Sequence, residues 1–424
     1  MVISESTLRE TLAHHAQQCP VGVASTGNLL VLGRRRLRRQ RIVASTGVVA
    51  VGIAGAIVAV TIHPQSAVHQ AREKSTGVHA AVWRGLPSLP ADAQQGNLLD
   101  TGQGLLYIAG ADNRQANMVA FALATGAGTW RQVPQAPLRW RTGETTIWTG
   151  TQAIAWGGAN DSGELADGAI LTPIEGWSSL PAAPLRARYS HQAVWAGIQM
   201  LVWGGAGGGQ VFNDGASYDP ATRLWSKLPT APLTPRSHFV AVWTGTEMLV
   251  WGGCGDATVS CDDVTTGAER ADGAAYSPTT RTWRTLAQAP LAAQDGRQAV
   301  WAAGKMIVWG GRSGQSRADG ASYDPRTDTW TRLSAGPLSS RVNFSMAWSG
   351  ARIVVWGGVD SSGRQLSDGA TFDPATWTWS KLPQSPLSPR SHAAMIADPP
   401  GAIIFGGCCE QTKAYLDGAR VRIP

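Results

Sequence analysis

Two short motifs return seven times along the chain at nearly constant spacing. The first is a tryptophan followed by a proline-containing turn, as in "WSKLPTAPL" from Trp225 and "WSKLPQSPL" from Trp379. The second is a hydrophobic run that ends in a glycine pair, as in "MLVWGG" ending at Gly205. The copies are about 47 residues apart, and the fourth interval is about ten residues longer. Repeats in phase at this period indicate stacked units of one architecture.

Each repeat holds four segments with the composition of β-strands. In the third copy they read "HQAVW", "QMLVW", "GASYD" and "RLWSK", between residues 191 and 227. A short turn joins the first two segments, and Asp219-Pro220 begins the turn between the last two. Four strands per unit, repeated seven times, predict an all-β fold, a seven-bladed β-propeller.

The two ends of the repeat region predict how the ring closes. Trp83 is preceded by no strands of its own repeat, and the last copy ends at "DGARVRIP", after its third strand. We therefore expect the strand around Ala80–Arg84 to be the outer strand of the seventh blade, so that no blade is left incomplete.

The glycine pair, the later aromatic residue and the tryptophan seven positions on resemble the kelch repeat. The resemblance covers residues 79–424 and implies a kelch propeller of the galactose-oxidase-like kind. The copper-radical oxidases among such propellers need ligating tyrosines. Here Tyr218, Tyr276 and Tyr323 fill a repeat position instead, which argues against that chemistry. No cofactor is expected.

An uncharged segment near the N-terminus predicts a membrane span. Ile42 to Ile62 is long enough as a helix, at about 31 Å, to cross a bilayer core of about 30 Å. The arginines of "GRRRLRRQR" stand directly before it and predict that this side stays in the cytosol. A cleaved or twin-arginine signal is the alternative. We expect an uncleaved anchor, with a cytosolic segment 1–41 that includes a short helix, a transmembrane helix 42–62, a linker 63–78 and the propeller 79–424 outside the cytosol.

The positive net charge is a local feature. Of the total of +7, residues 1–41 carry +5, so the remainder of the chain carries only +2. A nucleic-acid partner would require basic residues on the globular part, and the sequence therefore argues against one. The use of arginine and alanine with few lysines is compatible with a bacterial protein.

Candidate binding residues stand where the loops of a propeller converge. An arginine follows the Pro-Leu pair by three residues in most copies, and Gln294 takes its place in the fifth. The resemblance to kelch domains implies that this position lies near the central channel, where a guanidinium can bind a carboxylate at two points. The alternative is that the arginine supports the repeat. The candidates are Arg141, Arg188, Arg236, Arg341 and Arg390.

Other polar and aromatic residues accompany these arginines. His238, His392 and Asn343 each follow one of them by two residues, and Trp140 stands off the repeat between two arginines. They are candidate ligand contacts, although strand-end histidines with ordinary partners are the simpler interpretation, and no metal is expected. The aspartates of the repeated Asp-Gly pair are expected to cap backbone amides.

The cysteines offer one candidate disulfide. Cys254 and Cys261 both lie in the longer loop of the fourth repeat and could pair across it outside the cytosol. Cys408 and Cys409 are adjacent, and a vicinal disulfide, two free thiols or a soft-metal site are all open for them.

These observations give two hypotheses of different classes. The first is a membrane-anchored, extracytoplasmic propeller that binds a protein or glycan partner of acidic character through its loop rim, without catalysis. The second is an enzyme of the epimerase or mutarotase kind that acts on an acidic sugar. In that case the arginines would hold the carboxylate, and His238 or His392 would transfer a proton. The identity of the partner is beyond the sequence.

Overall fold

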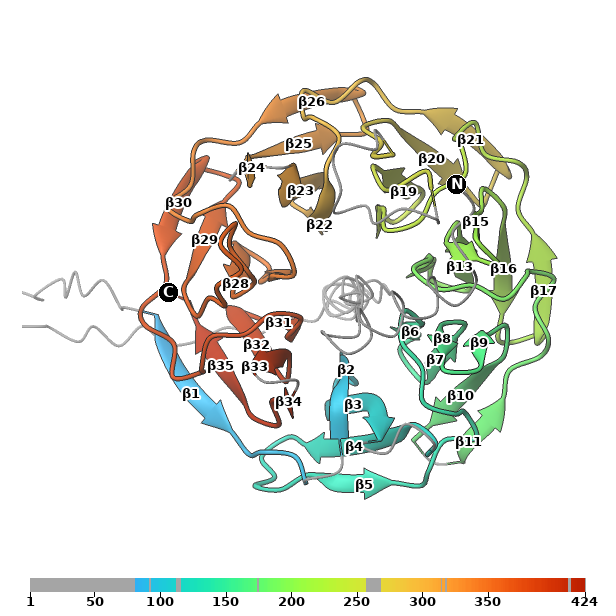
Figure 1. Ribbon diagram of the computed structural model, residues 1–424, viewed down its shortest axis with the longest axis horizontal. Helices are drawn as coiled ribbons and strands as arrows, with labels where there is room; N and C mark the ends of the chain where they lie inside the picture. The colour runs from blue at the N-terminus through green and yellow to red at the C-terminus, as the bar shows by residue number, and fades with distance from the viewer. Residues whose placement is uncertain are drawn as a thin grey trace, which may run out of the picture.

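The strands form a ring of seven sheets (Figure 1). The computed structural model describes residues 81–90, 93–111, 116–173, 175–256, 268–313, 315–316, 319–410 and 413–423. Within these ranges the regular elements are strands, and no helix occurs. The predicted all-β, seven-bladed propeller is therefore confirmed.

Each sheet of four or five strands is one blade, and in blades 1 to 6 the four main strands follow in chain order from the axis outward. The blades resemble one another closely because each is built from one copy of the repeat. Blades 1 to 4 are β2 (Ala93–Asp100), β3 (Gly104–Ala111), β4 (Val119–Ala124) and β5 (Arg131–Val133); β6 (Thr145–Trp148), β7 (Ala153–Trp156), β10 (Gly168–Thr172) and β11 (Gly176–Ser179); β12 (Gln192–Trp195), β13 (Met200–Trp203), β16 (Gly215–Asp219) and β17 (Leu224–Lys227); β18 (Val240–Trp243), β19 (Met248–Trp251), β20 (Gly273–Ser277) and β21 (Thr282–Thr285).

The remaining blades keep the same plan, and the seventh takes its outer strand from the start of the described chain. Blades 5 to 7 are β22 (Asp295–Ala302), β23 (Lys305–Ser313), β25 (Gly320–Asp324) and β26 (Thr329–Arg332); β27 (Ser345–Trp348), β28 (Ile353–Trp356), β29 (Gly369–Asp373) and β30 (Thr378–Lys381); β31 (Ala394–Asp398), β32 (Gly401–Phe405), β35 (Gly418–Arg422) and β1 (Val82–Leu86).

The ring closes as the sequence predicts. β1 pairs antiparallel with β35, from Val82 opposite Arg422 to Leu86 opposite Gly418. The two ends of the propeller thus belong to one sheet, and the seventh blade has four strands like the others.

Tryptophans of successive blades pack against each other and form the core between them. The tryptophan before the glycine pair is fully buried, and in blade 3 the Trp203 ring lies 5.8 Å from the outer-strand Trp283 of blade 4. The Trp283 indole N–H also donates to the Pro229 carbonyl, at 3.0 Å. The closing strand repeats this contact, because Trp83 meets Trp356 at 6.5 Å and donates to the Pro383 carbonyl. Ring closure therefore uses the same Trp–Trp contact as the interfaces from blade 2 to blade 6.

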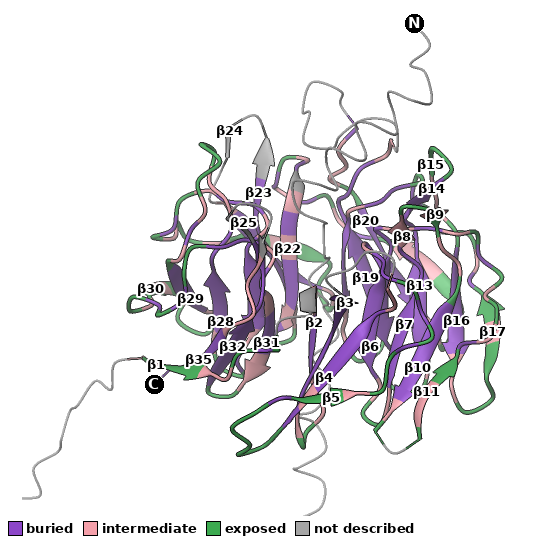
Figure 2. Cartoon of the chain, turned by 60° about the horizontal axis from the view of Figure 1, so that its bottom comes forward, coloured by how far each residue is buried: buried purple, intermediate pink, exposed green. Residues whose placement is uncertain are grey.

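The segments between strands divide into two opposite faces. The turns that join the first to the second strand and the third to the fourth form one end of every blade, which we call the turn face. The longer segments between the second and third strands form the other end, together with those that lead into each first strand. We call this end the loop face (Figure 2). Three short hairpins stand on the loop face: β8 (Ala159–Asn160) with β9 (Gly163–Glu164), β14 (Ala206–Gly207) with β15 (Gln210–Val211), and β33 (Cys408–Glu410) with β34 (Lys413–Ala414), beside β24 (Gln315–Ser316), which pairs with β23.

The predicted membrane span lies outside the described residues. Along the part of the chain that the structure describes, no helix has the length and apolar content needed to cross a membrane. The division of residues 1–78 into a cytosolic segment, a span and a linker stays a prediction from the sequence.

Replacing Trp83 tests the closure. Trp83→Ala removes the indole hydrogen bond to Pro383 and the packing against Trp356, and should destabilise the propeller by roughly 2–3 kcal/mol. The denaturation midpoint of the full chain, followed by tryptophan fluorescence, measures this. The control is Arg84→Ala, an exposed neighbour on the same strand, which should leave the midpoint nearly unchanged. Equal midpoints for both variants would contradict a closing role for β1.

Candidate functional site

The repeated arginine and aspartate form an ion pair in each blade where both occur. In blade 3, Arg188 donates to both carboxylate oxygens of Asp214, at 2.8 and 3.2 Å. It also donates to the Gly204 carbonyl at 2.9 Å and, through Nε, to the Arg186 carbonyl at 3.0 Å. All three guanidinium nitrogens are therefore engaged, in the bidentate geometry that gives the strongest charge-assisted hydrogen bonds. We call this unit the Arg–Asp clamp.

The backbone of the clamp arginine is bonded to the preceding blade. The amide of Arg188 donates to the Leu165 carbonyl at 3.1 Å, and the amide of Gly158 donates to the Arg188 carbonyl at 2.8 Å. Leu165 and Gly158 belong to blade 2, whereas the partners of the side chain belong to blade 3. The clamp therefore fastens two neighbouring blades at the loop face.

The five candidate arginines occupy the clamp and are not presented to a ligand. Each is at most 3% exposed and pairs with its own aspartate. This burial corrects the expectation that their guanidinium groups line a binding rim: the sequence alternative, support of the repeat, describes their place in the fold. The pairs are Arg141–Asp167, Arg188–Asp214, Arg236–Asp272, Arg341–Asp368 and Arg390–Asp417.

The carboxylates of the clamp aspartates accept mainly from the arginines, and those of Asp167 and Asp272 also accept from their own backbone amides. Burial acts to raise the pKa of Asp167 and Asp272, but the hydrogen bonds and charge of Arg141 and Arg236 outweigh it. The pKa of each therefore lies below its usual value, and the ion pairs stay charged at neutral pH.

Blade 5 builds its pair from a different arginine. Gln294, at the clamp position, is buried, and the cation comes instead from Arg297 on β22, whose Nη2 lies 3.1 Å from Asp319. Arg297 was not among the candidates from the sequence, because it stands outside the repeated position. The sequence signal for this pair was Asp319, because a carboxylate at this place costs free energy unless a cation lies beside it.

The residues two positions after the clamp position form an inner ring near the propeller axis. They stand just before the innermost strands or at their start, and each has a positive φ. Hydrogen bonds link neighbours around the ring: the His238 amide donates to the Ser190 carbonyl, and the His392 amide donates to the Asn343 carbonyl. The ring residues are Gly143, Ser190, His238, Gly296, Asn343 and His392.

The candidate histidines lie in this ring but in separate blades. His238 precedes β18 of blade 4 and His392 precedes β31 of blade 7, and each ring Nδ1 lies 3.1 Å from the hydroxyl of the serine before it. Burial lowers the pKa of His392 to about 4, so it is neutral at physiological pH. The structure does not bring the two histidines together as one acid–base pair.

A third histidine is a core residue between blades 2 and 3. His191 is fully buried, with its ring edge-on to Trp156 at 5.0 Å and its Nε2 2.9 Å from the Thr145 hydroxyl. Burial, and then the charge of Arg188, lower its pKa to about 3. Phe239 and Phe344 take the same place in blades 4 and 6, which shows that His191 substitutes for an aromatic packing residue.

Trp140 is buried as well, at 4% exposure. Its indole occupies the space beside Gly110 that a Cβ would need. It is therefore a packing residue between blades 1 and 2, and the expectation of an exposed ligand contact does not fit its position.

A polar cluster that the repeat does not predict lies nearby. Asn97 of blade 1 donates to the carboxyl group of Glu144 at 3.2 Å and lies 3.5 Å from the Thr146 hydroxyl. Burial raises the pKa of Glu144, with partial opposition from hydrogen bonds and from Arg141. Nothing in the repeat signals this cluster, because it fills an interface where the usual tryptophan is absent.

Two cysteines of the loop face, in different blades, each take part in a disulfide. Cys254 and Cys408 take the same place in blades 4 and 7, directly after the glycine pair. Each forms a backbone bridge to the serine that follows the clamp arginine, Ser237 or Ser391. Cys261 lies outside the described residues, and so does the side chain of Cys409. The pairing of Cys254 with Cys261 therefore stays a prediction.

The clamp aspartates present hydrogen-bond acceptors to solvent on the loop face. The five clamp aspartates have side chains between 43% and 58% exposed, although their arginine partners are buried. A carboxylate has about four lone-pair sites, so each keeps acceptor capacity beyond the arginine. Glu164 on the blade 2 hairpin is exposed too and accepts from the Gly208 amide of the blade 3 hairpin, at 3.1 Å. Among the described residues, no group of three or more His, Cys, Asp or Glu side chains is placed to hold a metal ion.

The repeat can now be compared with known families. The KLHDC2/KLHL20/DRC7 Kelch-repeats domain matches residues 145–338 and 296–418, which together make up more than half of the chain. The chain belongs to the Kelch-repeat domain family. No curated protein matches it. Kelch propellers are commonly protein-interaction modules, and the hairpins on the loop face of this Kelch propeller differ from blade to blade.

The clamp predicts a large difference between two arginines of one loop. Arg188→Ala leaves Asp214 and two carbonyls without their donor and should cost about 3 kcal/mol, whereas Arg186→Ala, at an exposed position two residues earlier, should cost about 0.5 kcal/mol or less. Chemical denaturation of both variants measures this. Arg188→Lys should recover little, because lysine lacks the planar fork. Full recovery with lysine would show that charge alone suffices.

The buried histidines predict a pH dependence of stability. Their pKa is depressed in the folded state, so below pH 6.5 the unfolded chain binds protons that the folded chain does not. Stability should therefore fall as the pH drops from 6.5 towards 4, by up to about 1.4 kcal/mol per pH unit for each histidine. His191→Phe, which introduces the residue found at the same place in blade 4, should remove its share. Denaturation midpoints at pH 7 and 4.5 test this, and identical pH slopes for variant and wild type would contradict it.

Proposed function

We propose that this Kelch propeller is a membrane-anchored, extracytoplasmic module that binds a protein partner through its loop face. The observation that carries the proposal is the difference between repeated and blade-specific residues. Strands and clamps recur from blade to blade, but the exposed hairpins differ, reading Asn160–Glu164 in blade 2 and Gly207–Gln210 in blade 3. Function in a repeat protein is expected on such variable loops, held in place by a rigid scaffold.

The chemistry of the loop face favours a partner that supplies hydrogen-bond donors. The exposed ends of the clamps are carboxylates, and Asp161 and Glu164 add to them in blade 2. Because each clamp aspartate is paired with an arginine, its attraction to a distant cation is reduced, but it still accepts hydrogen bonds at contact. The sequence analysis matched an acidic partner to free arginines. In the structure these arginines are buried, and the exposed ends of the clamps are carboxylates.

Two features support placement outside the cytosol. The uncharged segment Ile42–Ile62 follows a cluster of arginines, the arrangement of an anchor with a cytosolic N-terminus. Disulfides at Cys254 and Cys408 persist in oxidising compartments and are rare in the cytosol. The two features are independent of each other.

No observation favours the alternative of an enzyme that acts on an acidic sugar. The arginines that would hold the carboxylate are engaged in clamps. His392, one of the two candidate proton carriers, is neutral and hydrogen-bonded, and its counterpart His238 lies three blades away. Binding is therefore the function that we propose.

A photo-crosslinking amino acid at one position of each face tests the proposal. In blade 2, Ser162 is exposed on the loop face and Thr151 is exposed on the turn face. In native membranes, the full chain should give crosslinks to one defined polypeptide from position 162 and not from position 151. That polypeptide, identified by mass spectrometry and purified, should bind the full chain, and Ser162→Arg should weaken the dissociation constant by about tenfold or more, with Thr151→Arg as the control.

Three results would contradict this function. Equal crosslinking from both positions would remove the loop face as the site. Capture of glycan alone would replace the protein partner by a carbohydrate. Unchanged affinity in Ser162→Arg would show that the crosslinked polypeptide is a neighbour rather than a bound partner.

A further inference from the structure

We propose that the turn face of the propeller rests against the lipid bilayer, so that the loop face points away from the membrane. This inference builds on the proposed membrane anchor and adds an orientation and a second interaction surface. Three observations on the described residues carry it: where the chain enters the fold, which face exposes apolar side chains, and how the charges of that face are paired.

The chain enters the propeller at the turn face. Val82, the first residue of β1, lies opposite Arg422, which is itself paired with Gly401. Gly401 ends the turn that joins β31 to β32, and such turns define the turn face. Residues 63–80, between the predicted span and β1, cover at most about 60 Å when fully extended. To face the loop side towards the bilayer, this tether would have to run back along the side of blade 7.

The exposed apolar residues lie at the same end. Within the part of the chain that the structure describes, the large hydrophobic side chains with high exposure are Val82 at 53%, Ile198 at 74% and Leu224 at 66%. Ile198 is in the turn between β12 and β13, and Leu224 directly follows the turn between β16 and β17. All three are therefore at the turn-face end of their blades, on both sides of the ring, as a flat apolar contact would require.

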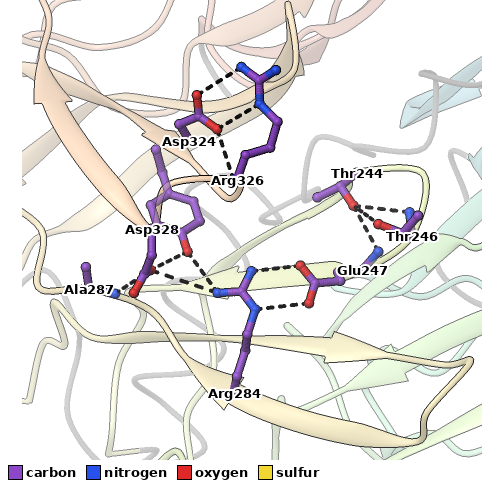
Figure 3. A network of polar contacts seen from close by, with 9 residues as sticks. Thr244, Thr246, Glu247, Arg284, Ala287, Asp324, Arg326 and Asp328 are labelled. Atoms are coloured by element: carbon purple, nitrogen blue, oxygen red, sulfur yellow. Dashed lines mark hydrogen bonds and ion pairs between the residues drawn. The ribbon is translucent and has the colours of Figure 1, made fainter.

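Charged residues on the blade 4 and blade 5 part of the turn face form ion pairs (Figure 3). Arg284 donates to both carboxylate oxygens of Glu247, at 3.0 and 2.7 Å, and to the Tyr323 hydroxyl at 3.1 Å. Tyr323 in turn donates to Asp328 at 2.6 Å. The network joins blades 4 and 5, and in it Arg284 faces two carboxylates, Glu247 and Asp328.

The same pairing occurs beside this network. Asp324 accepts from Arg326 at 3.2 Å and lies 3.7 Å from the Lys305 ammonium group. Paired charges cost less to bring to a surface of low dielectric than isolated ones.

Fluorescence quenching from the lipid side tests the orientation. In a Cys19→Ser background of the full chain, Ile198→Cys and Gln210→Cys place a thiol on opposite faces of the same blade, at two exposed positions. Each is labelled under non-reducing conditions with one fluorophore. The protein is then reconstituted in phosphatidylcholine vesicles that carry a nitroxide on the lipid headgroup. Quenching at position 198 should exceed quenching at position 210 several-fold.

The outcomes separate the orientation from the anchor. Equal quenching, or stronger quenching at position 210, in protein that stays with the vesicles after an alkaline wash would overturn the orientation and leave the anchor intact. Protein released by the wash would overturn the anchor and the orientation with it. Binding of the protein partner at the loop face is measured independently by the crosslinking experiment above.

Discussion

A buried guanidinium that bonds one blade with its side chain and the preceding blade with its backbone is the interaction on which the loop face depends. A propeller blade contacts its neighbours mainly through apolar side chains, which pack well but leave the loops at the ends without a fixed position. The Arg–Asp clamp supplies directional bonds at that end. Because Arg188 is fixed by Asp214 and Gly204 on one side and by Leu165 and Gly158 on the other, a shift of one loop would disturb the next. The variable hairpins therefore stand on a rigid base.

Much of this fold could be predicted from the sequence, because a repeat reports the same strand pattern seven times. The segments expected in the third copy correspond to β12, β13, β16 and β17, and Trp83 marked the strand that closes the ring. The roles of the polar repeats could not be predicted with the same success. Arginine and aspartate stand 26 residues apart in blade 3, and each was interpreted alone. The first repeat has neither the arginine nor the aspartate. Their joint absence was the sign in the sequence that the two residues form a pair.

The site residues illustrate the same limit. The sequence does not distinguish an arginine that is exposed at the rim from one that is buried. Burial depends on the residues that surround the side chain in three dimensions. Trp140 stood out because it broke the repeat, yet it is buried and its indole packs against Gly110. Departure from a repeat can thus indicate compensation in the core as well as function. The part of the clamp that remains accessible to a partner is the aspartate carboxylate, because the aspartates are half exposed while the arginines are buried.

Native-state hydrogen exchange of the clamp amides tests the central claim most directly. If the clamp fastens the blades, the amides of Arg188 and Gly205 should exchange as slowly as that of Leu201 in the core strand β13, because all would open only with the blades themselves. Exchange of Arg188 and Gly205 at the rate of Gly209, which lies on the exposed hairpin, would show that the loop face moves independently of the blades. That result would contradict a fastening role for the clamp.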